Sequence, residues 1–179
     1  MRCFKKIAIT PPQISPAVIE RCKILLQNGS ADILHLRFPN ATEIEMREVI
    51  EAIPKELYER IKLHSHYGLV EEYCLRGFHH NGNSPIEIQI RGGISKSCHS
   101  MEEVRQCVGK GYEYVTLSPV YDSISKAGYR GNEGLLNEPL PEGEEVIAMG
   151  GVTTEKFDEL AEYGFAGAAM IGQYFKDLI

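Results

Sequence analysis

Three late segments of the sequence carry residues that could together hold a phosphate group. Each segment follows an apolar run typical of a buried strand. Hydroxyls and an ammonium can bind phosphate oxygens, and glycine lets backbone N–H groups approach an anion closely. If the runs are parallel strands, their carboxyl ends meet at one edge, which predicts a phosphate site there. The residues concerned are Ser123, Ser125, Lys126, Gly150, Gly151 and Gly172.

A second group of polar residues lies earlier in the chain. The segment 33–38 alternates apolar and polar residues, which places His35 and Arg37 on one face of a strand. The guanidinium of Arg37 can form paired hydrogen bonds with a carboxylate or a phosphate. Ser97, at the end of a later strand, points the same way as His99, so either residue could face the centre of the site.

Four more histidines stand at or near predicted strand ends. His64 and His66 are two residues apart and share a strand face if the strand extends that far, while His79 and His80 close the next strand. An H-x-H pair also occurs in zinc sites, but no Asp or Glu completes such a set here. The pattern therefore favours histidines that bind no metal, and a zinc hydrolase is the remotest alternative.

The elements that must position these residues alternate regularly between strand and helix. Helical spacing and caps predict helices that start at Ser15-Pro16, Thr42, Tyr67, Ser100, Thr153 or Thr154, and Gly172. Apolar runs, several of them with period two, predict strands at 4–10, 33–38, 60–65, 77–80, 86–94 (entering the segment that contains Ser97), 114–120, 145–149 and 167–171.

Eight strand and helix units in strict alternation predict a single (β/α)₈ TIM barrel over residues 1–179. Such barrels usually need about 200 to 250 residues, so the helices after strands four and six are expected to be short. The alternative is an open doubly wound sheet of five or six strands. A dinucleotide-binding sheet would require a glycine-rich turn after its first strand, and none follows residue 10.

Composition excludes several classes of partner. The 19 Lys and Arg residues are scattered and the net charge is −6, so no basic stripe suits nucleic acid. The start of the chain has no apolar run long enough for a signal peptide or a membrane span, which predicts a cytoplasmic protein without a membrane partner. Five cysteines without a C-x-x-C pair favour reduced thiols. A homo-oligomer is compatible with the sequence, which does not fix the oligomeric state.

Longer segments resemble the thiamin phosphate synthase/TenI superfamily: HLR at 35–37, SCHSMEE at 97–103, EYVTLSPVYDSISKAG from 113, AMGGVTTEKF from 148 and GFAGAAMIG from 164. The resemblance covers nearly the whole chain in the correct order. It implies a (β/α)₈ barrel that binds thiazole phosphate through Ser123, Ser125, Gly150, Gly151, Ile171 and Gly172. In the synthase branch, Arg37, Ser97 and Lys126 would face a pyrimidine diphosphate.

The chain departs from the synthase pattern at the metal site that the resemblance implies. Synthases carry Gln, Arg and Lys along strand two, where this chain has His35, Arg37 and Pro39. Two acids that hold Mg²⁺ in synthases correspond here to His64-Ser65 and to the Asn83-Ser84 region. Because Mg²⁺ prefers anionic oxygen ligands, no cofactor is expected, and Mg²⁺ enters only if the chain is a synthase.

The HLR and S-x-HS-x-EE segments are more similar to the TenI branch, whose members shift a proton on a thiazole carboxylate phosphate. The acid-base histidine of that branch falls here on Pro119, so His64, His66 or His80 would have to replace it. The leading hypothesis is a thiazole tautomerase of this type. The alternatives are a thiamine-phosphate synthase and a non-catalytic binder or regulator of thiazole phosphate.

Overall fold

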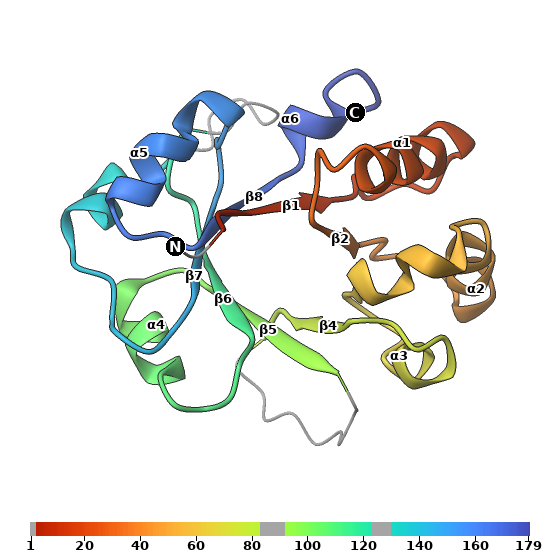
Figure 1. Ribbon diagram of the computed structural model, residues 1–179, viewed down its shortest axis with the longest axis horizontal. Coiled ribbons are helices and arrows are strands. Elements are labelled where there is room, and N and C mark those ends of the chain that lie inside the picture. The colour runs from red at the N-terminus through yellow and green to blue at the C-terminus, as the bar shows by residue number, and fades with distance from the viewer. Residues whose placement is uncertain (1–2, 83–91, 123–129) are drawn as a thin grey trace.

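Eight parallel strands pair in sequence order and close into a barrel in the computed structural model, which describes residues 3–82, 92–122 and 130–179 (Figure 1). The barrel closes because β8 pairs with β1, with Lys5 beside Gly167. The predicted (β/α)₈ barrel is thereby confirmed, and the open sheet is excluded. The strands are β1 (Lys5–Ile9), β2 (Ile33–Leu36), β3 (Ile61–Leu63), β4 (Gly77–His80), β5 (Gly93–Cys98), β6 (Tyr114–Leu117), β7 (Val146–Met149) and β8 (Gly167–Met170).

Helices cover the outside of the barrel (Figure 1). Their starts follow the capping residues in the sequence: the Ser15 hydroxyl accepts a hydrogen bond from the Val18 N–H, and Thr42 forms a capping box with Glu45. The α-helices are α1 (Pro16–Gln27), α2 (Glu43–Glu51), α3 (Gly68–Glu72), α4 (Met101–Cys107), α5 (Phe157–Glu162) and α6 (Gly172–Phe175). The 3₁₀ helices are η1 (Lys55–Arg60), η2 (Glu133–Asn137) and η3 (Thr154–Lys156).

Shortened connections fit the small size of the chain. Between β6 and β7 the described residues contain only the 3₁₀ helix η2, which agrees with the shortened helix expected there. The shortened helix expected after β4 falls on residues 83–91, which lie outside the described residues. Strand β5 is described from Gly93 to Cys98, and most of the predicted strand at 86–94 falls on residues outside the described ones.

Alternation along the strands separates an apolar outer layer from a partly polar interior. Leu34 and Leu36 pack into the main core between the barrel and its helices. The inward side chains include Ile33 and Tyr114, which belong to a second, smaller core inside the barrel. His35 shares the inward face with Ile33 and is fully buried. The barrel interior is therefore the place where buried polar groups gather.

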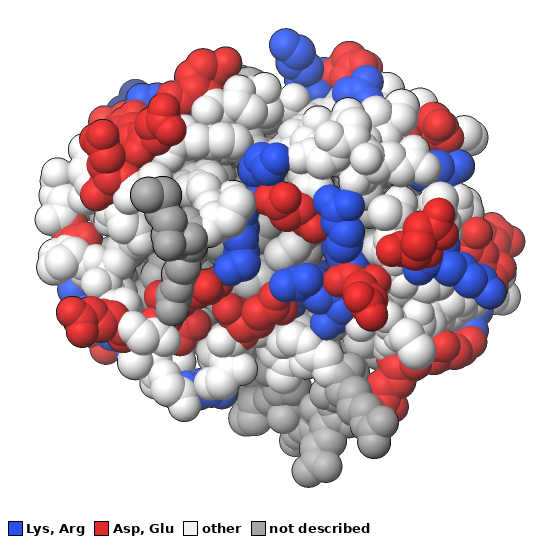
Figure 2. Space-filling model, in the orientation of Figure 1, with Lys and Arg blue, Asp and Glu red and all other residues white. Residues whose placement is uncertain are grey.

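The outer surface shows no segregation of charge on the face drawn in Figure 2, where Lys and Arg lie beside Asp and Glu. That mixture agrees with the absence of a basic stripe in the sequence. Among the described residues, no helix is both long enough and apolar enough to cross a membrane.

Candidate active site

Three histidines from neighbouring strands meet inside the barrel. His35 lies in β2, His64 directly follows β3, and His79 lies in β4. Their ring centroids are 4.5 to 5.1 Å apart, and one ring nitrogen of each lies within 4.8 Å of the others. His35 and His79 are buried and His64 is half-buried. We call these three residues the histidine cluster.

A line of hydrogen bonds connects the histidine cluster to the middle of the barrel. Nε2 of His35 and the Tyr114 hydroxyl are 2.6 Å apart, and Nδ1 of His35 and Nε2 of His64 are 2.9 Å apart and share one proton. Nδ1 of His64 is buried and has no hydrogen-bond partner of normal geometry, although the Asn81 side chain lies close enough to His64 to raise its pKa. A buried, unpaired ring nitrogen costs free energy unless a ligand completes it, so this atom is the open end of the line.

Serines of β5 hold the third histidine. Ser95 Oγ is 2.9 Å from Nδ1 of His79, and Ser97 Oγ is 2.8 Å from Nε2. These contacts fix the orientation of the ring. Ser97, a predicted substrate contact, thus lies beside the histidine cluster.

Burial keeps the imidazoles of the histidine cluster neutral. Desolvation lowers the pKa of His64 to about 3, with the charge of Arg37 adding to the effect. Desolvation also holds the pKa of His35 and of His79 well below the ordinary value, and repulsion from a protonated His64 would lower both further. Neutral imidazoles can accept a proton or bind a metal.

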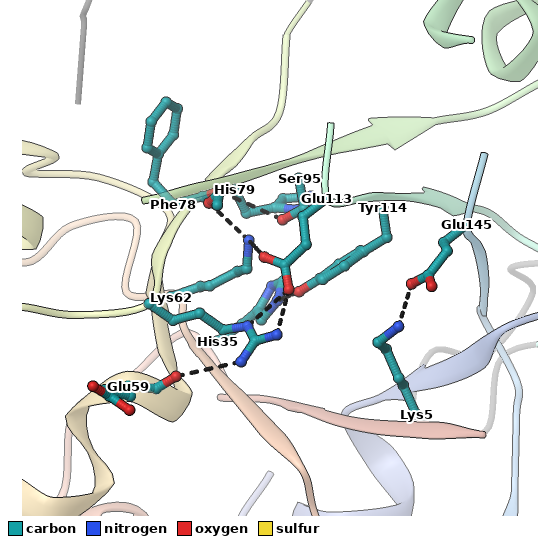
Figure 3. A network of polar contacts seen from close by, with 12 residues as sticks. Lys5, His35, Glu59, Lys62, Phe78, His79, Ser95, Glu113, Tyr114 and Glu145 are labelled. Carbon is teal, nitrogen blue, oxygen red and sulfur yellow. Dashed lines mark hydrogen bonds and ion pairs between the residues drawn. The ribbon is translucent and has the colours of Figure 1, made fainter. Parts of the chain in front are cut away.

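A buried ion pair between Lys62 and Glu113 lies beside His35 and Tyr114, near the residues at which β5 and β6 begin (Figure 3). Lys62 Nζ lies 2.8 Å from Glu113 Oε2, donates to the Gly93 carbonyl, and sits over the Tyr114 ring. Glu113 also accepts from the guanidinium of Arg76. Desolvation lowers the pKa of Lys62 to about 8 although Glu113 opposes the shift. A Cβ at position 93 would lie 2.1 Å from Glu113 Oε2, so glycine makes room for the carboxylate.

The described part of the predicted phosphate site lies at the carboxyl ends of β7 and β8, which are neighbours. Gly150 and Gly151 follow β7 with φ of 94° and 63°. A Cβ on Gly151 would lie 2.1 Å from the Asp122 carbonyl, so this turn needs glycine for its φ and for its close packing. Ile171 and Gly172 follow β8, but α6 has only four residues and a correspondingly small dipole. Ser123, Ser125 and Lys126 lie outside the described residues.

Two predicted histidines do not join the cluster. Strand β3 ends at Leu63, so it does not extend far enough for His64 and His66 to share a strand face. His66 instead has a φ of 53°, and its Nε2 contacts the Ala41 carbonyl. His80 alternates with His79 along β4 and therefore points to the opposite face. Arg37 directly follows β2 and is half-buried, and its charge acts on His64 and His79.

Sequence reasoning missed His79 as a site residue, together with Ser95, Tyr114 and Lys62. Strand alternation could have identified His79, because it shares a face with Gly77 at the start of β4 and not with Phe78. Tyr114 gave no such signal, since a tyrosine that opens an apolar strand is equally typical of a core residue.

The donor set does not fit the magnesium ion that the synthase pattern implies. Among the described residues, the histidine cluster is the one group of three or more potential ligands, and it contains no carboxylate. Mg²⁺ requires hard oxygen ligands, usually carboxylates. A surface groove lined by Glu51, Glu56, Glu59, Glu72 and other residues lies on the outside of the barrel, where its acidic lining does not suit a phosphate.

Comparisons with known proteins agree on one family. The family model described as thiamine monophosphate synthase matches residues 86–173. The chain is 34% identical over 82 residues to a thiamine-phosphate synthase of Levilactobacillus brevis. It is 31% identical over 87 residues to a putative thiamine-phosphate synthase of Geobacter sulfurreducens. These two matches cover 44% and 47% of this chain, but only 38% and 41% of the relatives' own lengths.

A solved structure extends the likeness to nearly the whole chain. The crystal structure of a thiamine phosphate pyrophosphorylase from Bacteroides thetaiotaomicron is 30% identical, with a TM-score of 0.81. The match covers 98% of this chain and 86% of the other.

Proposed function

Because the chain belongs to the thiamine monophosphate synthase family, we propose that it binds a thiazole phosphate at the carboxyl end of the barrel and shifts a proton on its ring. The observation that carries this proposal is the unpaired Nδ1 of His64, at the open end of the line that runs from Tyr114 through His35. Within the family, this function corresponds to a thiazole tautomerase of the TenI type.

His64 is the proposed acid-base residue. Its Nδ1 takes a proton from one atom of the thiazole ring while the C–H electron pair moves into the ring, and it then returns a proton to a second ring atom. No metal is needed for this step. The proton shared by His35 and His64 can move along the line as His64 becomes charged, so Tyr114 and His35 are positioning residues.

The low pKa of His64 in the free protein makes it a weak base at pH 7. An anionic ligand near His64 stabilises the charged imidazole and raises this pKa again. Arg37 is the residue proposed to pair with a carboxylate or phosphate of that ligand. Gly150, Gly151, Ile171 and Gly172 remain the proposed phosphate contacts, together with the predicted Ser123, Ser125 and Lys126, and Ser97 is a proposed substrate contact.

The test is to incubate the purified protein with the non-aromatic thiazole carboxylate phosphate tautomer and to follow its aromatisation. We expect His64→Gln to reduce the rate by a factor of about 100 to 10,000, the usual contribution of a positioned acid-base group. His99→Gln is the matched control, because His99 is exposed and outside the histidine cluster. A wild-type protein that gives no acceleration, or a His64→Gln variant as fast as the wild type, would contradict the proposal.

Synthase activity is the second candidate, and the names of the relatives favour it. It would couple a pyrimidine diphosphate to thiazole phosphate with release of pyrophosphate. Magnesium-dependent formation of the coupled product would establish this activity in place of proton transfer. Calorimetric binding of thiazole phosphate with turnover in neither assay would instead support a non-catalytic binder or regulator.

A further inference from the structure

The histidine cluster has the ligand types and the spacing of a transition-metal site. Three imidazoles from three adjacent strands present ring nitrogens within 4.8 Å of one another. A tetrahedral ion with Zn–N bonds of about 2.0 to 2.1 Å holds its ligand nitrogens about 3.3 Å apart. Nδ1 of His35 and Nε2 of His64 are already 2.9 Å apart. Small ring rotations that shift the ligand nitrogens by about 1.5 Å or less would therefore bring all three to metal-binding distance.

We propose that His35, His64 and His79 bind one divalent transition-metal ion of the Zn²⁺ class, with the fourth coordination position open to the mouth of the barrel. Nδ1 of His35 and Nε2 of His64 and His79 are the proposed ligand atoms. The proposal goes beyond the proton transfer proposed above and does not depend on it.

The outer nitrogens of two rings already have the partners that such a site requires. Nε2 of His35 contacts the Tyr114 hydroxyl at 2.6 Å, and Nδ1 of His79 contacts Ser95 Oγ at 2.9 Å. In metal sites, hydrogen bonds of this kind fix the tautomer and the orientation of each ligand ring. With each outer nitrogen protonated, the three ligand nitrogens carry lone pairs and no ring has to lose a proton. Nε2 of His79, which lies 2.8 Å from Ser97 Oγ, exchanges that contact for the metal ion.

Protons compete weakly for these nitrogens, because burial keeps the pKa of all three rings low. Three Lys and Arg charges act on the cluster. Those of Lys62 and Arg76 are offset by their ion pairs with Glu113. The charge of Arg37 favours an anion in the open position, either hydroxide or a carboxylate or phosphate of a ligand.

Metal binding and proton transfer are alternative states of His64. A metal on Nε2 places the ring proton on Nδ1, and that nitrogen can then no longer act as a base. The loaded protein is therefore expected to lose the proton-transfer activity proposed above. Metal binding itself is measured without any substrate, so the failure of one proposal does not affect the test of the other.

The experiment titrates the chelator-treated protein with Co²⁺, whose visible absorption reports four-coordinate binding, and then displaces Co²⁺ with Zn²⁺. We expect one ion per chain, full displacement by Zn²⁺, and no displacement by millimolar Mg²⁺. His64→Gln and His79→Gln are each expected to weaken binding by at least about 100-fold, beyond the 10- to 100-fold typical of losing a second-shell partner. His99→Gln is expected to bind as the wild type does.

A measurement on the wild type keeps the test independent of how the variants fold. Co²⁺ should shift the N–H protons of three imidazoles in the NMR spectrum, one from each ring. Fewer than three shifted imidazole protons would overturn the proposal. So would the absence of stoichiometric binding, binding that survives in folded His64→Gln and His79→Gln, or an equal loss in His99→Gln.

Discussion

At the scale of single residues, the barrel interior contains a few buried polar atoms whose hydrogen-bond partners are all other protein atoms. His35 is fully buried, and both of its ring nitrogens are used, one by Tyr114 and one by His64. Burial also raises the pKa of Tyr114, so its hydroxyl keeps its proton at physiological pH. Because water cannot reach these atoms, the loss of one partner leaves the other unpaired.

Tyr114→Phe tests the contact between the Tyr114 hydroxyl and His35. The variant keeps the ring and leaves Nε2 of His35 buried without a partner. We expect a loss of about 1 to 3 kcal/mol in the free energy of unfolding, with an unchanged dependence on urea. Tyr163→Phe is the control, because Tyr163 is 44% exposed, and it should change stability by less than about 0.5 kcal/mol. Equal stability of the two variants would show that the hydroxyl contributes nothing.

At the scale of elements, strands β3 to β6 form the polar side of the barrel. Glycines begin β4 and β5. Glu113 just before β6 and Lys62 of β3 fill the space beside Gly93, whereas Gly77 packs against the backbone of Gly93. The Lys62 side chain is completely buried, whereas that of Glu113 is 23% exposed. A buried pair of this kind contributes little net stability, but removing one member leaves a desolvated charge.

Glu113→Gln is expected to lower the free energy of unfolding by about 3 kcal/mol or more, because the Lys62 ammonium loses its counter-charge. Adding Lys62→Met to this variant should restore much of the loss, since no buried charge then remains. Glu138→Gln breaks the exposed pair with Arg105 and should cost less than about 1 kcal/mol. Urea unfolding of all four proteins provides the measurement, and a double variant less stable than Glu113→Gln would refute the explanation.

At the scale of the whole molecule, the neutral histidine cluster couples folding to pH. In the unfolded chain each histidine regains a pKa of about 6.5, whereas that of folded His64 is about 3. The unfolded state therefore binds more protons below pH 6.5. Stability is fully present above that pH and is lost as the pH falls toward the folded pKa, by up to about 1.4 kcal/mol per pH unit for each histidine.

The free energy of unfolding should therefore fall less steeply with decreasing pH when a histidine of the cluster is removed. Between pH 6.5 and pH 4.5, His64 alone is expected to account for about 2.5 kcal/mol of the stability that the wild type loses. His64→Gln should show a loss smaller by that amount in urea titrations at the two pH values. Carboxylates titrate alike in both proteins, so the difference isolates His64. Parallel pH profiles would contradict the assigned pKa.

The amino-acid sequence by itself determined the architecture and the family. Eight apolar runs alternating with capped helices permit few parallel topologies, and in a barrel every strand end of one kind lies on one face. Residues such as Gly150, Gly151 and Ile171 could therefore be assigned to the edges of neighbouring strands from their order alone. His35 and Arg37 could be assigned to one face from the period-two pattern of their segment.

Only the tertiary structure decided which polar residues meet. Adjacent residues of a strand point to opposite faces, but only closure of the barrel shows which face of β4 is inward and therefore that His79 and not His80 joins His35 and His64. Tyr114, Ser95 and Lys62 come from separate strands, and nothing local distinguishes them from ordinary core or surface residues. Their contacts arise from closure of the barrel, which brings β2 through β6 around one interior and removes water from it.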